Sequence, residues 1–130
     1  MRPVSRYGPP LAVMALIFVL SAQPDLSSGL GAWDTLLRKL GHVTIYAILW
    51  LTVARATQWR RPVVATVIAL LYATSDEFHQ SFVPGRHGSP IDVAIDALGI
   101  GLAALAWAGA VQRRGQSPGP PVTSPSGGEP

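Results

Sequence analysis

The residues best suited to chemistry form one dense run, SDEFHQSFVPGR, at positions 75–86. The run offers carboxylates, an imidazole, an amide and a guanidinium, which are the groups used in acid–base chemistry and in anion binding. Helical spacing places Asp76 beside His79 and Gln80, and Glu77 beside Gln80. The Pro-Gly pair that follows predicts a turn that directs Arg86 back toward the end of the helix.

Two other segments carry polar groups at helical spacing. Lys39, His42 and Tyr46 share one face of a helix, and Asp92 and Asp96 lie one turn apart on another. Small residues continue the aspartate face at Gly99, Ala103 and Ala106. Because small residues mark close packing between membrane helices, we expect both aspartates to point into a bundle. Ionisable groups in such a position suggest function by default.

Each of these residues also has a purely structural interpretation. Asp92 could complete a capping box with Ser89 at the start of the last helix. His42 and Tyr46 could be interhelical hydrogen-bond partners. Arg86 could neutralise a carboxylate of its own run. Taken together, so many ionisable groups at one end of a small bundle favour a functional site.

Four apolar segments must position these residues. They run from about residues 7 to 22, 36 to 56, 62 to 80 and 89 to 111, with Asp34 as the expected N-cap of the second. Each approaches the roughly 20 residues that a membrane-spanning helix needs. The prediction is an all-α integral membrane bundle of four transmembrane helices. Trp50 and Trp107 are expected on helix surfaces.

The composition agrees with a bilayer as solvent. Only 13% of the 130 residues are charged, against roughly 25% in soluble domains, and the mean hydropathy is +0.31. The basic residues form no helix face or aromatic-interleaved stripe, which argues against a nucleic-acid partner. There are no cysteines, which excludes disulfides and thiolate metal sites. A signal peptide is the alternative for the first segment, but cleavage after Ala22 would place bulky Leu20 where a small residue is preferred.

The distribution of charge predicts the orientation in the cell membrane. The N-terminus, the 55–61 loop and the C-terminal tail hold most of the arginines, so the positive-inside rule places both termini in the cytoplasm. The polar cluster would then face outward. We expect a transmembrane domain over residues 1–111 and a disordered Pro/Gly/Ser-rich tail over residues 112–130.

The run at 75–86, followed by Asp92 and Asp96, resembles the VanZ-like family of bacterial membrane proteins. The Lys39-x-x-His42-x-x-x-Tyr46 pattern is similar to the second helix of that family, and SAQP at 21–24 to the end of its first. Two positions depart from it: Arg38 stands where an aspartate is common, and Asp96 where asparagine is common. The resemblance implies an envelope protein, and a link to resistance against the glycopeptide teicoplanin, which acts outside the membrane on lipid-linked wall precursors.

Three functions are compatible with this pattern. The first is binding of an amphipathic envelope ligand, a lipid-linked precursor or a lipoglycopeptide, with Lys39 and Arg86 holding its anionic group. The second is an enzyme acting on a lipid headgroup, with Glu77 or His79 as the acid–base residue. No short-spaced metal motif is present, so no metal or other cofactor is predicted, although His42, His79 and the carboxylates are acceptable ligand types. A transporter is the weakest of the three because the acids lie at one end of the helices. The oligomeric state is left open.

Overall fold

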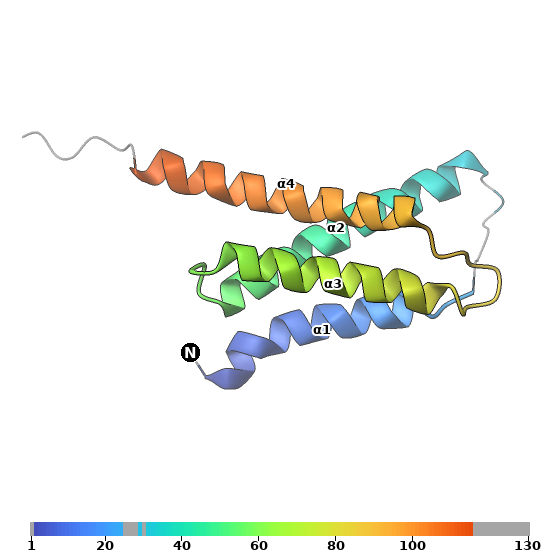
Figure 1. The fold of residues 1–130 in the computed structure, drawn as a ribbon, viewed down its shortest axis with the longest axis horizontal. Coiled ribbons are helices and arrows are strands. Elements are labelled where there is room, and N and C mark those ends of the chain that lie inside the picture. The colour runs from blue at the N-terminus through green and yellow to red at the C-terminus, as the bar shows by residue number, and fades with distance from the viewer. Residues whose placement is uncertain (1, 25–28, 30, 116–130) are drawn as a thin grey trace, which may run out of the picture.

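The computed structural model describes residues 2–24, 29 and 31–115, and the regular secondary structure within these residues is all α-helix (Figure 1). The four helices are α1 (Pro3–Ser21), α2 (Ala32–Ala56), α3 (Pro62–Gln80) and α4 (Pro90–Gly115). The prediction of four helices is therefore confirmed. The tail from residue 116 onward lies outside the described residues, so its predicted disorder stays a prediction.

Local sequence explains where the helices begin. Pro3 and Pro62 occupy the first turns of α1 and α3, where the missing N–H of proline costs no hydrogen bond. The expectation that Asp34 caps α2 is wrong. The N-cap is Gly31, whose φ of 58° suits a glycine, and the Asp34 amide donates to the Gly31 carbonyl at 3.2 Å, inside the first turn.

The last helix is longer than the hydrophobic pattern suggested. It continues past Val111 to Gly115, so the polar residues at 112–115 belong to α4 and not to the tail. Arg113 and Arg114 lie in its last turn, where their positive charge interacts favourably with the negative end of the helix dipole.

The core of the bundle lies where α2 crosses α4 and α3. Gly99 allows α4 to approach the α2 backbone, because a Cβ added there would lie 2.9 Å from the carbonyl carbon of Val43 and closer still to its oxygen. Ala103, one turn further, is buried, but Ala106 is exposed because the helices diverge there. Trp50 is fully buried in this core and donates to Thr66 Oγ1 at 2.9 Å, so the expectation that it lies on a helix surface is wrong.

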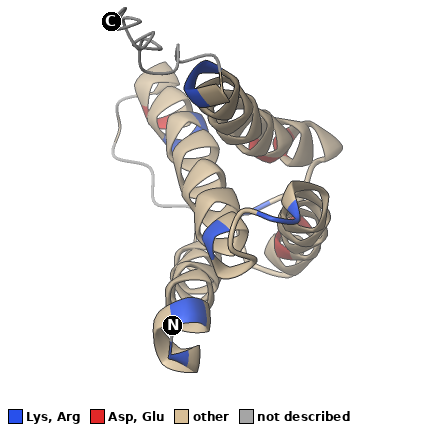
Figure 2. Ribbon diagram, turned by 90° about the vertical axis from the view of Figure 1, so that its left-hand side faces the viewer, with Lys and Arg blue, Asp and Glu red and all other residues tan. Residues whose placement is uncertain are grey.

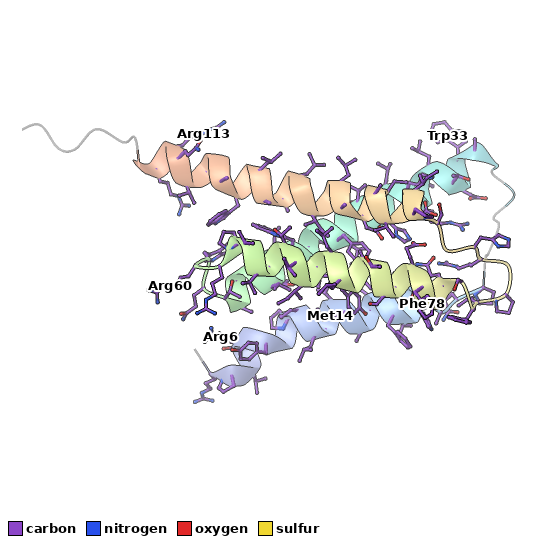
Figure 3. The ribbon with its side chains drawn as sticks, viewed as in Figure 1. Arg6, Met14, Trp33, Arg60, Phe78 and Arg113 are labelled. Carbon is purple, nitrogen blue, oxygen red and sulfur yellow. The ribbon has the colours of Figure 1, made fainter. Side chains whose placement is uncertain are left out.

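The two ends of the bundle differ in charge. The first residues of α1, the α2–α3 connection and the end of α4 lie at the same end of the molecule (Figure 1), the end that faces the viewer in Figure 2. Figure 3 places the labelled Arg6, Arg60 and Arg113 at this end, opposite Trp33 and Phe78. The described acidic residues belong to the opposite end, in the first turns of α2 and α4 and the last turns of α3.

Three of the described helices, α1, α2 and α4, are long and apolar enough to cross a membrane. Large apolar side chains are exposed along the outside of the bundle, among them Leu16, Leu51, Leu71 and Leu105. An aqueous protein of this size would not leave so much apolar surface uncovered, whereas lipid covers it without cost.

Candidate functional site

A hydrogen-bonded chain of side chains links α2, α3 and the loop that follows α3. The Tyr46 hydroxyl donates to Asp76 Oδ2 at 3.0 Å, and the Gln80 amide donates to the same oxygen at 3.2 Å. Gln80 Oε1 in turn accepts from Arg86 Nη1 at 3.1 Å. Tyr46, Asp76 and Gln80 are buried. The predicted return of Arg86 toward the helix end is therefore confirmed, and its guanidinium is held by a neutral amide.

A second set of contacts joins α2 to α4. His42 Nδ1 lies 2.8 Å from Asp96 Oδ1, and Asp96 is fully buried. Lys39 Nζ lies 3.5 Å from Asp92 Oδ1 in a more exposed pair. The predicted inward direction of Asp96 is thus confirmed, and the shared face of Lys39, His42 and Tyr46 is the one that meets the other helices.

The loop before α4 is held by Glu77 and not by Asp92. The backbone N–H of Ser89 donates to Glu77 Oε2 at 3.1 Å, so the capping box between Ser89 and Asp92, the structural alternative for Asp92, does not form. Ser89 Oγ accepts from the Ile91 N–H at 3.2 Å, which is an ordinary N-cap contact. Asp92 is left to pair with Lys39 across the helices.

His79 lies apart from the other predicted site residues. Its ring stacks on Phe18 of α1 with the ring centroids 4.6 Å apart. It lines neither of the two cavities found at this end of the bundle. Of the ten predicted site residues, eight line one of these cavities, and Asp96 bonds to one of the eight, His42. Only His79 lies elsewhere, between α1 and α3.

Two adjoining cavities open at this end. The larger, about 630 Å³, is walled mostly by apolar side chains of α1 and α2 such as Ile17, Leu20 and Ile45. The smaller, about 340 Å³, is polar and lies between α2, α3 and α4. Its lining consists of Thr35, Arg38, Lys39, His42, Glu77, Gln80, Gly85, Arg86, His87, Asp92 and Ile95.

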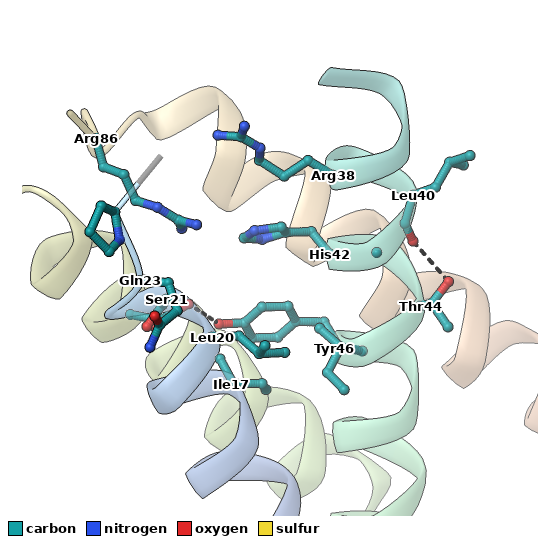
Figure 4. Close-up of a pocket in the computed structure, with 14 residues that line it drawn as sticks. Ile17, Leu20, Ser21, Gln23, Arg38, Leu40, His42, Thr44, Tyr46 and Arg86 are labelled. Carbon is teal, nitrogen blue, oxygen red and sulfur yellow. Dashed lines mark hydrogen bonds between the residues drawn. The ribbon is translucent and has the colours of Figure 1, made fainter. Parts of the chain in front are cut away.

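Three cationic or ionisable side chains line both cavities: Arg38, His42 and Arg86. In Figure 4 they point toward one another from α2 and from the loop after α3, with Tyr46 beneath them. We call this group the basic junction. The Nε of Arg86 is buried, with no hydrogen-bond partner in the described part of the chain.

Sequence reasoning missed several of these residues. Arg38 was noted only because the VanZ-like family commonly has an aspartate at this position, yet it lines both cavities. Its position directly before Lys39 was the signal in the sequence that could have identified it. His87 follows Arg86 directly and lines the polar cavity. The apolar wall from α1 had no signal, because Ile17 and Leu20 look like any lipid-facing residues.

Of three comparisons with known proteins, one gives a match. No curated protein and no solved structure matches the chain. The VanZ/LLP1 family model matches residues 9–111, which include α1 from Pro9 onward, all of α2 and α3, α4 up to its last turn, and every residue of the basic junction. The chain is a membrane-helix protein that belongs to the VanZ/LLP1 family.

Proposed function

We propose that this protein binds an anionic amphiphile of the cell envelope, with the apolar chain in the larger cavity and the anionic group at the basic junction. The observation that carries the proposal is that an apolar cavity and a polar cavity adjoin and share Arg38, His42 and Arg86. A lipid-linked phosphate has the same division into an apolar chain and a charged head.

The larger cavity suits the apolar part. Its volume of about 630 Å³ falls within the roughly 300–1,000 Å³ of pockets that hold small molecules. It lies between α1 and α2, so a longer chain can extend from it along the exposed apolar side chains into the bilayer.

The basic junction suits the head. Arg86 is oriented by Gln80, while its buried Nε has no partner in the residues described, so a donor remains for an incoming oxygen. Guanidinium groups bind phosphate and carboxylate in a bidentate manner, and the partly buried setting strengthens that bond. Lys39 adds positive charge at the rim, although Asp92 offsets part of it.

The uneven distribution of basic residues supports an orientation in which both termini lie in the cytoplasm. Seven of the ten basic residues belong to the end that holds the start of α1, the α2–α3 connection and the end of α4, namely Arg2, Arg6, Arg55, Arg60, Arg61, Arg113 and Arg114. By the positive-inside rule that end is cytoplasmic and the basic junction faces outward. We include α3 as a fourth spanning helix, since it lies alongside the other three over the same length of the bundle (Figure 1).

A reaction on the headgroup with Glu77 and His79 as an acid–base pair has less support. His79 stacks on Phe18 outside both cavities, whereas Glu77 lines the polar one. A general acid or base must reach the proton that it transfers, within about 3 Å or through one water. Binding therefore explains the geometry with fewer assumptions.

The test is native mass spectrometry of the purified chain in detergent, titrated with a polyprenyl phosphate and separately with the matching uncharged polyprenol. We expect the phosphate to bind at least about tenfold more tightly, because charge-assisted hydrogen bonds contribute roughly 1.5–3 kcal/mol. Arg86→Ala should remove most of that preference. Arg86→Lys should retain only part of it, because lysine cannot form the bidentate contact.

The matched control is Arg113→Ala, which removes an arginine at the opposite end of the bundle. It should leave the preference unchanged. Equal binding of the phosphate and the alcohol, or full binding by Arg86→Lys, would refute the proposal. Teicoplanin in place of the lipid forms a separate arm, in which a preference for teicoplanin over the phosphate would identify a lipoglycopeptide as the ligand.

A further inference from the structure

Three potential metal ligands from three helices converge beside the polar cavity, which His42 and Glu77 line. One ring nitrogen of His42, one carboxylate oxygen of Glu77 and one of Asp96 all lie within 4.8 Å of one another. His42 comes from α2, Glu77 from α3 and Asp96 from α4. Because each ligand belongs to a different helix, no short-spaced motif in the sequence could reveal the group.

The two carboxylates are buried, and only one oxygen of each has a hydrogen-bond partner among the described residues. Glu77 is 4% exposed and Asp96 is 0% exposed. One oxygen of each has a partner: the Ser89 N–H for Glu77 Oε2 and His42 Nδ1 for Asp96 Oδ1. The other oxygen of each, Glu77 Oε1 and Asp96 Oδ2, is buried with no hydrogen-bond partner within the described ranges.

Such unpaired oxygens are costly. A buried ionised carboxylate loses several kcal/mol of hydration, and it is normally found paired with a cation or bound to a metal. Among the three side chains themselves, two ionised carboxylates beside a single imidazole carry more negative than positive charge. A bound cation would satisfy both oxygens at once.

We propose that His42, Glu77 and Asp96 bind one divalent first-row metal ion, zinc or manganese. The mixture of imidazole and carboxylate ligands favours these ions over magnesium and calcium, which prefer oxygen ligands alone. This inference does not rest on the proposed lipid ligand, since all three groups belong to the chain itself.

The spacing needs only a small adjustment. Bonds of about 2.0–2.2 Å in tetrahedral geometry put neighbouring ligand atoms roughly 3.3 Å apart, so the widest pair must close by at most about 1.5 Å. Rotation of side chains accomplishes a shift of that size. His42 and Glu77 line the polar cavity, which gives the ion a path from solvent and leaves a further coordination position open to a ligand there.

The experiment measures zinc and manganese binding to the whole chain, purified in lipid-free detergent without a polyhistidine tag and treated with a chelator. Isothermal titration calorimetry should show one ion per chain for the wild type. Asp96→Asn and Glu77→Gln should each weaken binding by at least about 100-fold, since even the loss of an outer-shell partner costs roughly 10- to 100-fold. Asp34→Asn, an acid of the same end that lines neither cavity, and His79→Gln should bind like the wild type.

Folding of each variant is checked by helical circular dichroism and gel filtration. X-ray absorption of the zinc-loaded wild type requires no variant and should show one imidazole together with oxygen ligands. The proposal is overturned if the wild type binds no ion at stoichiometric amounts, if folded Asp96→Asn and Glu77→Gln still bind, or if the spectrum lacks an imidazole. Lipid titration in excess chelator tests the proposed function independently, so either idea can fail alone.

Discussion

Gly99 of α4 packs directly against the backbone of α2, and adding one methyl group there should force α4 away from α2. In Gly99→Ala the new Cβ would lie 2.9 Å from the Val43 carbonyl carbon and 3.0 Å from its Cα. Carbon atoms prefer separations of about 3.5–4.0 Å, so the helices must separate by roughly 1 Å. The obstacle is backbone, which cannot rotate aside as a side chain would.

The expected change in the free energy of unfolding is the sum of two opposing contributions. Overpacking of a well-packed interface costs about 1–3 kcal/mol, and the upper end applies against backbone. Replacing glycine with alanine in a helix interior stabilises the helix by about 1 kcal/mol. We expect a net destabilisation of about 2 kcal/mol, with added loss at the His42–Asp96 contact one turn away.

Gly101→Ala is the matched control, because nothing lies within 4 Å of a Cβ at that position of the same helix. It should be stabilising by up to about 1 kcal/mol. The assay is unfolding of the two variants in mixed micelles with increasing dodecyl sulfate, followed by circular dichroism. If Gly99→Ala is as stable as Gly101→Ala, the close packing of α4 on α2 is wrong.

Three further predictions concern the polar end of the bundle. Tyr46→Phe removes the hydroxyl that, together with the Gln80 amide, donates to the buried Asp76 carboxylate, and should destabilise the protein by about 1–2 kcal/mol in the same unfolding assay; an unchanged midpoint would contradict the contact. Lys39→Gln should cost less than about 1 kcal/mol, because its pair with Asp92 is long and partly exposed, and a larger loss would mean that this pair is a major structural contact. Because the wild type has no cysteine, a single introduced cysteine reports its own side of the membrane. Ser81→Cys should react with a membrane-impermeant thiol reagent in intact cells and Thr123→Cys only after lysis; the reverse pattern would overturn the proposed orientation.

Helical periodicity was sufficient to find the elements and the inward faces. The shared face of Lys39, His42 and Tyr46 follows from spacing, and the inward position of Asp96 from the small residues on its face; the structure has both. The start of α2 did not follow, because Asp34 is a common N-cap residue and its position alone could not show that the helix begins a turn earlier at Gly31.

Contacts between helices could not be read from local patterns. The Ser89 amide has an ideal local acceptor in Asp92, yet it donates to Glu77 on another helix because the loop packs against the end of α3. His79 has the spacing to join Asp76, but α1 presents Phe18 to its ring. Ala106 continues the small-residue face, but the crossing of α4 and α2 leaves it exposed. These outcomes depend on crossing angles and on which helices are neighbours.

The most direct test of the proposed binding site is to locate the apolar chain of a bound ligand. A polyprenyl phosphate analogue with a photoreactive diazirine in its chain is crosslinked to the purified protein, and the modified residues are identified by mass spectrometry. The proposal predicts crosslinks at the cavity wall, on Ile17, Leu20, Leu40 and Ile45, and their loss in Arg86→Ala. Crosslinks spread evenly over lipid-facing residues such as Leu71 and Leu105, and unchanged in Arg86→Ala, would contradict it.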